Sequence, residues 1–525
     1  MLFDRTFHPD EANQAFAVGK LLETGSYTYN PADHHGPTLY YAAAPVQRLC
    51  GAAGTASLEE VPLRSVPLAF AVLTIVFALL AARRLIADQA RARVVPCASG
   101  RAGRAALPWI LALLAVLPLA TLPILFFFST YFIQEALLGC FLAGMFWCGV
   151  EYFHAWKSPG RVKPGTWAMF LGIFAGLAFA TKETSVIAFL SAAIAAAPFA
   201  IAARRRKKDR PLPEKAASHA TIAAAAGLLT AALLFSSFAS NWHGVYAAFI
   251  EAPLSYLGRA GGSAASEGAA DHVHEWWWYL KVLFGYPIFN CRWLGALFLV
   301  GLAGGYRRPS KPVAFVSLYA VASLVVYSLV PYKTPWCMLT VAEAMAFAAG
   351  LNMTVAGEGF SLKEALTMPL WRRLVCSPLL HMALLALTVA TQYFLCEKIG
   401  RYPDNPMIPY NYANASWDVK NAAEFAMKKL AEEKDPEAYA AVCLPADMTW
   451  PLPWYLRKAK AGYWQSIDAL PMSLPKRPSV VILGDDDSEK RMEMRFPELN
   501  GGATYGIRPG VLCTIRYKDK DATAP

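Results

Sequence analysis

The chain contains 525 residues, of which 56% are hydrophobic and 17% are charged, and its mean hydropathy is +0.32. This composition excludes an ordinary soluble globular protein, which carries about a quarter charged residues. The formal net charge of +11 is divided among short loops, so it does not indicate a nucleic-acid-binding surface.

The first 64 residues precede any apolar stretch and favour two amphipathic helices joined by the turn YNPADHHGP. They contain an acid pair, Asp10 and Glu11, and two adjacent histidines, His34 and His35. No signal peptide or apolar h-region occurs here. We therefore expect that a membrane helix precedes Met1, the alternative being a short tail that is translocated without one.

Ten apolar stretches of a length that can span a bilayer follow. They are Ser65–Ala82, Ala106–Leu125, Tyr131–Phe153, Trp167–Ala180, Ser185–Ala203, His219–Phe238, Pro287–Tyr306, Val313–Val330, Trp336–Val355 and Ser377–Cys396. Alternate loops are rich in lysine and arginine, including the run RRRKKDR that begins at Arg204. Because cytoplasmic loops carry such residues, we expect the N-terminal segment and the tail after Cys396 to lie on the outer face of a plasma (inner) membrane.

Two further segments have a distinct composition. The stretch HVHEWWWYLKVLFG is expected to lie in the membrane interface as an aromatic belt. From residue 397 the chain becomes less apolar: NAAEFAMKKLAEEK predicts an amphipathic helix, and YAAVCLP, SVVILGD and GVLCTIRY predict strands. We therefore divide the chain into an outer segment (1–64), a multi-span body (65–396) and a small α/β domain (397–525). Of the ten cysteines, only Cys443 and Cys513 share an outer region where they could pair.

Ionisable residues are concentrated in the segments expected on the outer face. Besides the acid pair and the histidines, the candidates are Glu135, Lys182, Glu183, Arg292 and Lys333. Charged groups at membrane depth are costly and usually functional. A carboxylate can act as general base on an acceptor hydroxyl, and cations can stabilise a departing phosphate. A sugar linked to a lipid phosphate would use both, whereas no glycine-rich loop that could hold a nucleotide is present.

Several motifs together resemble the GT-C superfamily of membrane glycosyltransferases: HPDEA, HHGPTLYY, YFIQEALL, TKETS and DMTWPLPWYLR, between His8 and Arg457. The resemblance is greatest to the prokaryotic branch related to protein O-mannosyltransferases, the flippase-activity-associated proteins. It implies an α-helical multi-pass fold, a polyprenyl-phosphate-linked sugar as donor, and inverting hexosyl transfer on the outer face to a protein, lipid or glycan acceptor.

The resemblance also assigns roles to residues. Asp10, with Glu11 beside it, corresponds to the acid of the first outer loop, and Glu135 corresponds to a second acid at the outer end of a helix. Related lipid A aminoarabinose transferases carry a lysine in the stretch occupied here by Asp33, His34 and His35. This chain lacks that lysine, so phosphate binding there would depend on histidine, with the cations Lys182, Arg292 and Lys333 as further substrate ligands.

Other interpretations remain open at this point. Asp10 could cap a helix, Lys182 could extend to the interface, and Arg292 could be an interface anchor. His243, His272 and His274 could hold a divalent metal with an acid. DMTWPLPWYLR could pack structurally or bind the acceptor. The chain as a whole could instead be a flippase or transport partner for a lipid-linked sugar, or a non-catalytic envelope assembly protein.

Overall fold

The computed structural model describes residues 5–31, 35–92, 101–158, 160–206, 215–255, 272–284, 311–355, 378–403, 405, 407–412, 414–484 and 486–519. The chain divides into two compact units. The sheet unit comprises Met1–Gly25, Ala43–Leu63 and Asn411–Pro525, and the helical unit comprises Ser26–Ala42 and Arg64–Tyr410. Most of the expected outer N-terminal segment therefore belongs to the same unit as the C-terminal domain, although hundreds of residues separate them in sequence.

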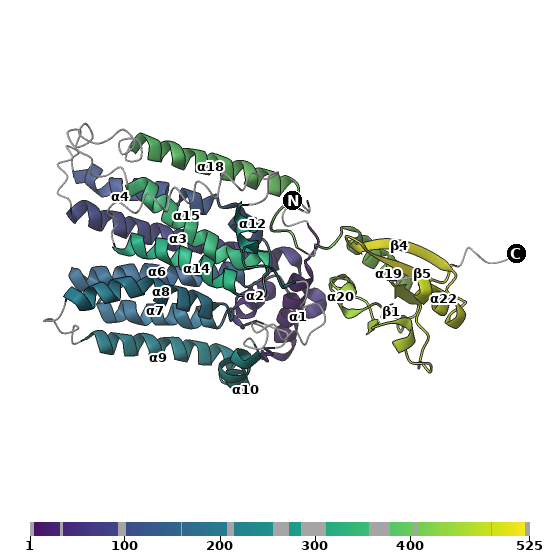
Figure 1. The fold of residues 1–525 in the computed structure, drawn as a ribbon. Helices are drawn as coiled ribbons and strands as arrows, with labels where there is room; N and C mark the ends of the chain where they lie inside the picture. Colours follow the sequence, from purple (N-terminus) through teal and green to yellow (C-terminus); the bar gives the residue numbers. More distant parts are fainter. Residues whose placement is uncertain are drawn as a thin grey trace. The chain divides into compact units, whose positions relative to one another are not determined.

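Helices dominate the helical unit and run side by side (Figure 1). Among the described residues, seven helical stretches are long and apolar enough to cross a membrane. They lie in α3 (Glu60–Ala92), α6 (Glu135–Lys157), α8 (Ser185–Arg206), α9 (Ala216–Phe235), α14 (Lys311–Leu329), η5–α15 (Pro335–Cys337 and Met338–Val355) and α18 (Pro378–Arg401). Two shorter apolar helices lie in α4 (Arg101–Ala120) and α7 (Pro164–Phe179). Nine of the ten expected spans thus correspond to helices, and the tenth, 287–306, lies outside the described residues.

Shorter elements connect these helices. They are α2 (Thr38–Leu49), α5 (Pro123–Phe128), α10 (His243–Tyr246), the π-helical turn η2 (Ala247–Glu251) and α12 (Trp278–Phe284). The expected span Ala106–Leu125 is wrong at its C-terminal end, because α4 stops at Ala120 and α5 starts at Pro123. Proline has no N–H for the preceding turn but suits the first position of a new helix, so Pro123 separates the two.

Helices α7 and α9 approach each other closely at glycines. A Cβ atom on Gly172 would lie 2.0 Å from the carbonyl oxygen of Ala223, and one on Gly176 would lie 2.4 Å from that of Gly227. The spacing Gly172-x-x-x-Gly176 places both glycines on one face of α7. This small-residue packing replaces the hydrophobic driving force that helices lack inside a lipid bilayer.

The sheet unit is built on five strands in the order β2-β1-β3-β5-β4. The strands are β1 (Ala440–Cys443), β2 (Ala461–Trp464), β3 (Val480–Leu483), β4 (Gly501–Arg508) and β5 (Val511–Tyr517). Strand β1 runs parallel to β2 and β3, whereas β5 is antiparallel to β3 and β4. The helices are α1 (Pro9–Thr24), α19 (Asp418–Glu432), α20 (Ala446–Thr449), α21 (Leu452–Tyr455) and α22 (Asp486–Arg495), with 3-10 turns η1 (Thr55–Ser57) and η6 (Ile467–Ala469). The predicted helix and three predicted strands correspond to α19, β1, β3 and β5.

Cys443 and Cys513, which the sequence left able to pair, form no disulfide with each other. Both cysteines are buried and free, and they belong to the hydrophobic clusters on opposite faces of the sheet. Strand β3 lies between β1 and β5, so two interstrand spacings of about 4.8 Å each separate their backbones. That separation exceeds the Cα–Cα distance of about 7 Å that a disulfide can bridge.

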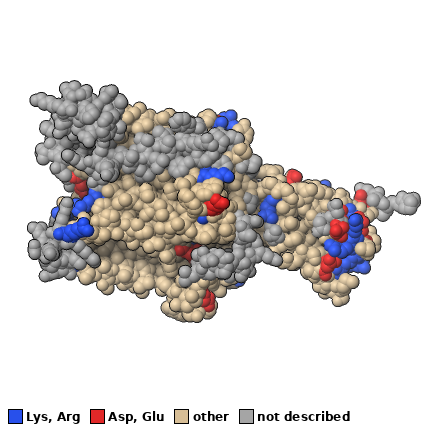
Figure 2. All heavy atoms as spheres, viewed as in Figure 1, with Lys and Arg blue, Asp and Glu red and all other residues tan. Residues whose placement is uncertain are grey.

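Charge is distributed differently over the two units. On the visible face, the described part of the helical unit shows only scattered charged side chains, whereas Lys, Arg, Asp and Glu are closely mixed on the C-terminal part of the sheet unit (Figure 2). Within the sheet unit, Arg516 pairs with Glu493 and Arg477 pairs with Glu498. The sparsely charged face suits a lipid environment, and the mixed surface suits water.

Candidate functional site

In the helical unit, Lys182 and Glu135 form a buried ion pair. Lys182 lies in the turn between α7 and α8, and Glu135 is the first residue of α6. Their side chains are only 6% and 4% exposed, and the ammonium donates a short hydrogen bond to the carboxylate. Burial lowers the pKa of Lys182, but the facing carboxylate of Glu135 outweighs this effect and raises it. The lysine therefore stays charged.

The next residue, Glu183, binds a different segment of the chain. Its Oε2 lies 2.9 Å from Nδ1 of His35, and its Oε1 accepts a hydrogen bond of 3.1 Å from the hydroxyl of Tyr29. Burial would raise the pKa of the Glu183 carboxyl, but the charge and hydrogen bond of His35 lower it to about 2. Glu183 is therefore an anion that holds Tyr29 and His35 against the turn.

Backbone contacts fix the position of His35. The backbone N–H of Thr38 donates to the carbonyl oxygen of Ala180 at 3.3 Å, and the Thr38 hydroxyl donates to that of Thr181 at 2.8 Å. The hydroxyl of Tyr27 donates to the carbonyl oxygen of His35 at 3.0 Å. Gly36 permits this approach, because a Cβ atom there would lie 2.1 Å from the Ala180 oxygen. His35, Gly36 and Thr38 thus dock on the turn that carries Lys182 and Glu183.

Lys333 provides a second cation in this unit. It follows α14 in a loop where Tyr332 and Val273 form an isolated antiparallel bridge. Its side chain is 1% exposed, and its ammonium donates to the carbonyl oxygens of His274, at 3.0 Å, and Val330. Burial lowers the pKa of Lys333. No carboxylate of the described residues pairs with it, so its charge is balanced only by carbonyl dipoles.

Tyr279 and Cys337 lie beside the loop that carries Lys333. The hydroxyl of Tyr279 donates to the carbonyl oxygen of Thr334 at 3.3 Å, and Sγ of Cys337 lies 3.2 Å from Oγ1 of the same threonine. The ring of Tyr279 lies 6.0 Å from Nζ of Lys333, a distance at the limit of a cation–π contact. We use the name loop site for five residues of the helical unit: His35, Glu135, Lys182, Glu183 and Lys333.

In the sheet unit, Asp10 lies at the second position of α1. The expectation that Asp10 could cap this helix is wrong, because the N-cap residue is His8, whose Nδ1 accepts a hydrogen bond of 3.1 Å from the Asp10 backbone N–H. Since Nδ1 accepts, the ring proton is on Nε2, which donates to the Tyr412 carbonyl oxygen at 2.7 Å. Nδ1 of His8 also lies 3.9 Å from Oδ2 of Asp10.

The Asp10 carboxylate itself is 48% exposed and makes no hydrogen bond with the described residues. Pro9 at the first helical position and the capping His8 fix the backbone around it. Its side chain thus projects from a rigid helix start with its oxygens available to a substrate. A carboxylate in this setting can accept a proton.

Glu11 is fully buried. Its Oε2 accepts hydrogen bonds from Nη1 of Arg5 at 2.6 Å and from the backbone N–H of His8 at 3.0 Å, and Nη2 of Arg5 donates to its Oε1 at 3.3 Å. The residue closes a reciprocal capping box with His8. In this arrangement Glu11 holds the helix start that carries Asp10.

The remaining candidates are distributed as follows. His34 and Arg292 lie outside the described residues. His243 is exposed and lies 3.8 Å from Glu251, and His274 stacks on Trp278 at 4.4 Å. Across the described ranges, no group of three or more His, Cys, Asp or Glu side chains is arranged to hold a metal ion.

The sequence alone did not single out Arg5, His8 or Tyr29. The role of His8 as a helix N-cap could have been predicted, because His-Pro-Asp-Glu has the spacing of a capping box, with histidine in place of serine or threonine. Tyr29 had none, since its partner Glu183 is 154 residues away in sequence.

Comparisons with known proteins identify the fold. No protein-family profile and no curated protein sequence matches the chain. Two crystal structures of ArnT from Cupriavidus metallidurans are similar to it. The structure bound to undecaprenyl phosphate has a TM-score of 0.61 at 13% identity, covering 99% of this chain and 96% of ArnT. The apo structure has the same TM-score at 14% identity, covering 98% and 94%. The chain therefore has the GT-C fold of ArnT, a membrane glycosyltransferase, and these matches do not support the O-mannosyltransferase-like branch in particular.

Proposed function

We propose that this protein is a membrane glycosyltransferase that moves a hexose from a polyprenyl-phosphate donor to an acceptor hydroxyl on the outer face of the membrane. The observation that carries the proposal is the exposed, rigidly mounted Asp10 carboxylate in a chain with the GT-C fold. The donor class is supported by the fold match to ArnT bound to undecaprenyl phosphate. The outer location is supported by the lysine- and arginine-rich alternate loops.

The proposed reaction is a single inverting displacement. The acceptor oxygen bonds to the anomeric carbon while the bond between that carbon and the phosphate oxygen breaks. The acceptor proton passes to the Asp10 carboxylate, and the polyprenyl phosphate leaves with the bonding electrons. Glu11 acts here as a positioning residue for Asp10, since both of its oxygens are engaged by Arg5 and His8.

We assign the leaving phosphate to the loop site. Lys333 carries a charge that no described carboxylate balances, and His35 is 32% exposed beside Glu183. Such cations stabilise the negative charge that develops on a departing phosphate. Glu135 keeps Lys182 charged and in place within the same group. His34 and Arg292 are proposed as additional ligands on sequence grounds alone.

The test is transfer by the purified chain in proteoliposomes. Radiolabelled polyprenyl-phosphate hexoses serve as donors and a cell-envelope fraction as the source of acceptor. We expect Asp10→Asn to reduce transfer by at least about a hundredfold, the usual contribution of a general base. Asp468→Asn is the matched control, because Asp468 is a 62% exposed aspartate of the same unit, whose ion pair within the described ranges is with Arg491 at 3.4 Å.

The outcome also separates the alternative functions. Equal transfer by the wild type and Asp10→Asn would contradict the assignment of Asp10 as base. A wild type that moves labelled donor across the bilayer without transferring the sugar would instead favour a flippase. No activity with any donor, combined with stable binding of an envelope protein, would favour an assembly role.

A further inference from the structure

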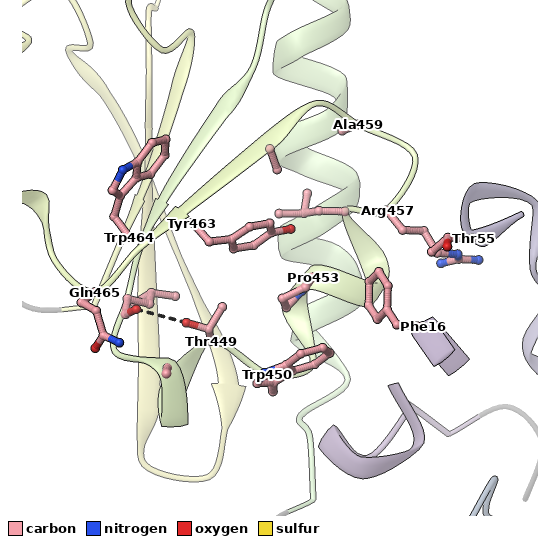
Figure 3. Close-up of a pocket in the computed structure, with 14 residues that line it drawn as sticks. Phe16, Thr55, Thr449, Trp450, Pro453, Arg457, Ala459, Tyr463, Trp464 and Gln465 are labelled. Atoms are coloured by element: carbon pink, nitrogen blue, oxygen red, sulfur yellow. Dashed lines mark hydrogen bonds between the residues drawn. The ribbon is translucent and has the colours of Figure 1, made fainter. Parts of the chain in front are cut away.

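The sheet unit contains an open pocket of about 510 Å³ that the proposed reaction leaves unused. Its lining comes from α1, η1, the segment around α20 and α21, and the edge strand β2 (Figure 3). This volume lies within the range of about 300–1,000 Å³ that is usual for small-ligand sites. The DMTWPLPWYLR motif supplies one wall, so the structure gives this motif a place at a cavity.

Four aromatic residues line the pocket: Phe16, Trp450, Tyr463 and Trp464. Tyr463 is 44% exposed and its ring points toward Pro453, whereas the Trp464 ring points away from it (Figure 3). Trp450 and Trp464 are half-buried, so each keeps part of its ring accessible. Flat aromatic surfaces of this kind bind the C–H face of a sugar ring, because that face is apolar while its edge is polar.

Gly462 determines how Trp464 lies. A Cβ atom on Gly462 would meet the Trp464 ring at 2.3 Å, so the indole packs directly over the glycine backbone. Any side chain at position 462 would displace the ring.

Hydrogen-bonding groups stand beside the rings. Gln465 is exposed, with amide donors and an acceptor. Arg457 donates to the carbonyl oxygens of Trp454, at 2.8 Å, and Leu58, at 2.9 Å, while its buried Nε–H has no partner among the described residues. A sugar edge, with its dense hydroxyls, would satisfy such groups.

We propose that this pocket binds a glycan. A polypeptide is the main competing ligand, since β2 is an edge strand, but this strand has only four residues and offers few main-chain hydrogen bonds. Four aromatic residues with an amide and a guanidinium beside them suit sugar rings better. The pocket reaches α1 through Phe16, six residues after Asp10, which corresponds to about 9 Å along the helix axis. The further assignment, that the glycan is the acceptor, rests on the proposed function.

Binding is tested with the full-length chain in detergent micelles. The probes are tri- to hexasaccharides of glucose, mannose, galactose and N-acetylglucosamine, and unglycosylated octapeptides as the competing class. Saturation-transfer NMR and tryptophan fluorescence titration measure binding. We expect at least one oligosaccharide series to bind saturably, and Tyr463→Ala and Gly462→Ala each to weaken it about tenfold.

Matched controls distinguish a pocket effect from a folding effect. Trp417→Ala removes a 53% exposed aromatic residue of the same unit that does not line the pocket. Gly506→Ala adds a methyl group on β4 where the nearest atom is 3.7 Å away. Both should leave the affinity unchanged, and thermal unfolding should show that Tyr463→Ala remains folded.

The proposal fails if no oligosaccharide binds, if binding is insensitive to both pocket variants, or if only the octapeptides saturate the site. Its failure is separable from that of the proposed function. Asp10→Asn should lose transfer but retain glycan affinity. If the wild type binds glycans through these residues and yet transfers no sugar, the pocket assignment stands and the transferase assignment falls.

Discussion

Lys182 and Glu183 are adjacent in the chain, yet different elements hold their side chains. Lys182 pairs with Glu135 at the start of α6, whereas Glu183 binds His35 and Tyr29 from the segment before α2. One turn between α7 and α8 therefore joins two distant parts of the helical unit. Lys182 and Glu183, which the sequence suggested for substrate binding, therefore also make structural contacts. Experiments on these residues have to distinguish a loss of substrate binding from a loss of stability.

The pH dependence of stability tests the Glu183 contact. The carboxyl pKa is lowered from 4.5 to about 2, so the ionised form contributes about 3 kcal/mol. This stability is fully present above pH 4.5 and is lost as the pH falls toward 2. The Glu183→Gln variant has no charge at this position, so it lacks this contribution to stability at every pH. The difference in melting temperature between wild type and variant, followed by tryptophan fluorescence in detergent, should therefore shrink on acidification from pH 6 to pH 3.

A matched glutamate identifies effects that do not arise from this contact. Glu251 is 39% exposed and lies 3.8 Å from His243, so Glu251→Gln should change the melting temperature little at either pH. A difference between wild type and Glu183→Gln that stays constant down to pH 3 would contradict the lowered pKa of Glu183.

The buried pair of Lys182 and Glu135 makes a second prediction. Lys182→Met leaves Glu135 buried without its cation, which should cost about 3–5 kcal/mol. The double variant Glu135→Leu with Lys182→Met removes both charges and should recover most of that stability. Thermal unfolding measures the stability of the single and the double variant, and sugar transfer in proteoliposomes measures their activity. If the pair serves the reaction, the double variant will be stable but inactive; recovery of transfer would reduce the pair to a structural contact.

Local patterns in the sequence predicted most of the elements. The apolar stretches predicted the membrane helices because a bilayer requires a fixed length of apolar residues. Strands β1, β3 and β5 were predicted because they are central and rich in branched side chains. The edge strands β2 and β4 were missed: AGYW is only four residues long, and GGATYGIR contains three glycines, which weaken any strand signal.

The candidate site was predictable in its residue types but not in its contacts. The charged candidates were identified because a charged side chain near a membrane span is costly, and this reasoning applies to each residue separately. Their partners depend on tertiary packing: His35 meets Glu183 across 148 positions of sequence. Phe16 and Trp450, whose rings are 5.7 Å apart, come from opposite ends of the chain. No local pattern encodes such pairs.

Lys333 gives a kinetic prediction. Replacing it by Met removes the cation that no described carboxylate balances, and phosphate binding should weaken. We expect KM for the polyprenyl-phosphate donor to rise about tenfold or more, since a charge-assisted bond contributes about 1.5–3 kcal/mol. Lys281→Met, an exposed lysine in α12, is the control and should leave KM unchanged. An unchanged donor KM in a folded Lys333→Met protein would exclude it as a phosphate ligand.

The two buried cysteines of the sheet unit predict insensitivity to reduction. Cys443 and Cys513 are free and lie on opposite faces of the sheet. Dithiothreitol should therefore change neither the electrophoretic mobility nor the melting temperature of the chain. Mass spectrometry after thiol labelling of the unfolded protein should find both residues modified without prior reduction. A linked Cys443–Cys513 peptide would contradict the strand order.

The helix start that carries Asp10 makes the last prediction. Glu11→Gln removes the charge that balances the buried guanidinium of Arg5, a loss of about 3–5 kcal/mol. Because Asp10 is held through this helix start, kcat should fall while KM for the donor changes little. Glu23→Gln, at the other end of α1, is the matched control: Glu23 is exposed and accepts only from the backbone N–H of Thr55 among the described residues. Arg5→Met with Glu11→Leu should regain stability without regaining kcat, because the His8 backbone N–H still loses its acceptor. If kcat instead followed stability through all these variants, Glu11 would serve the fold alone and would not position Asp10.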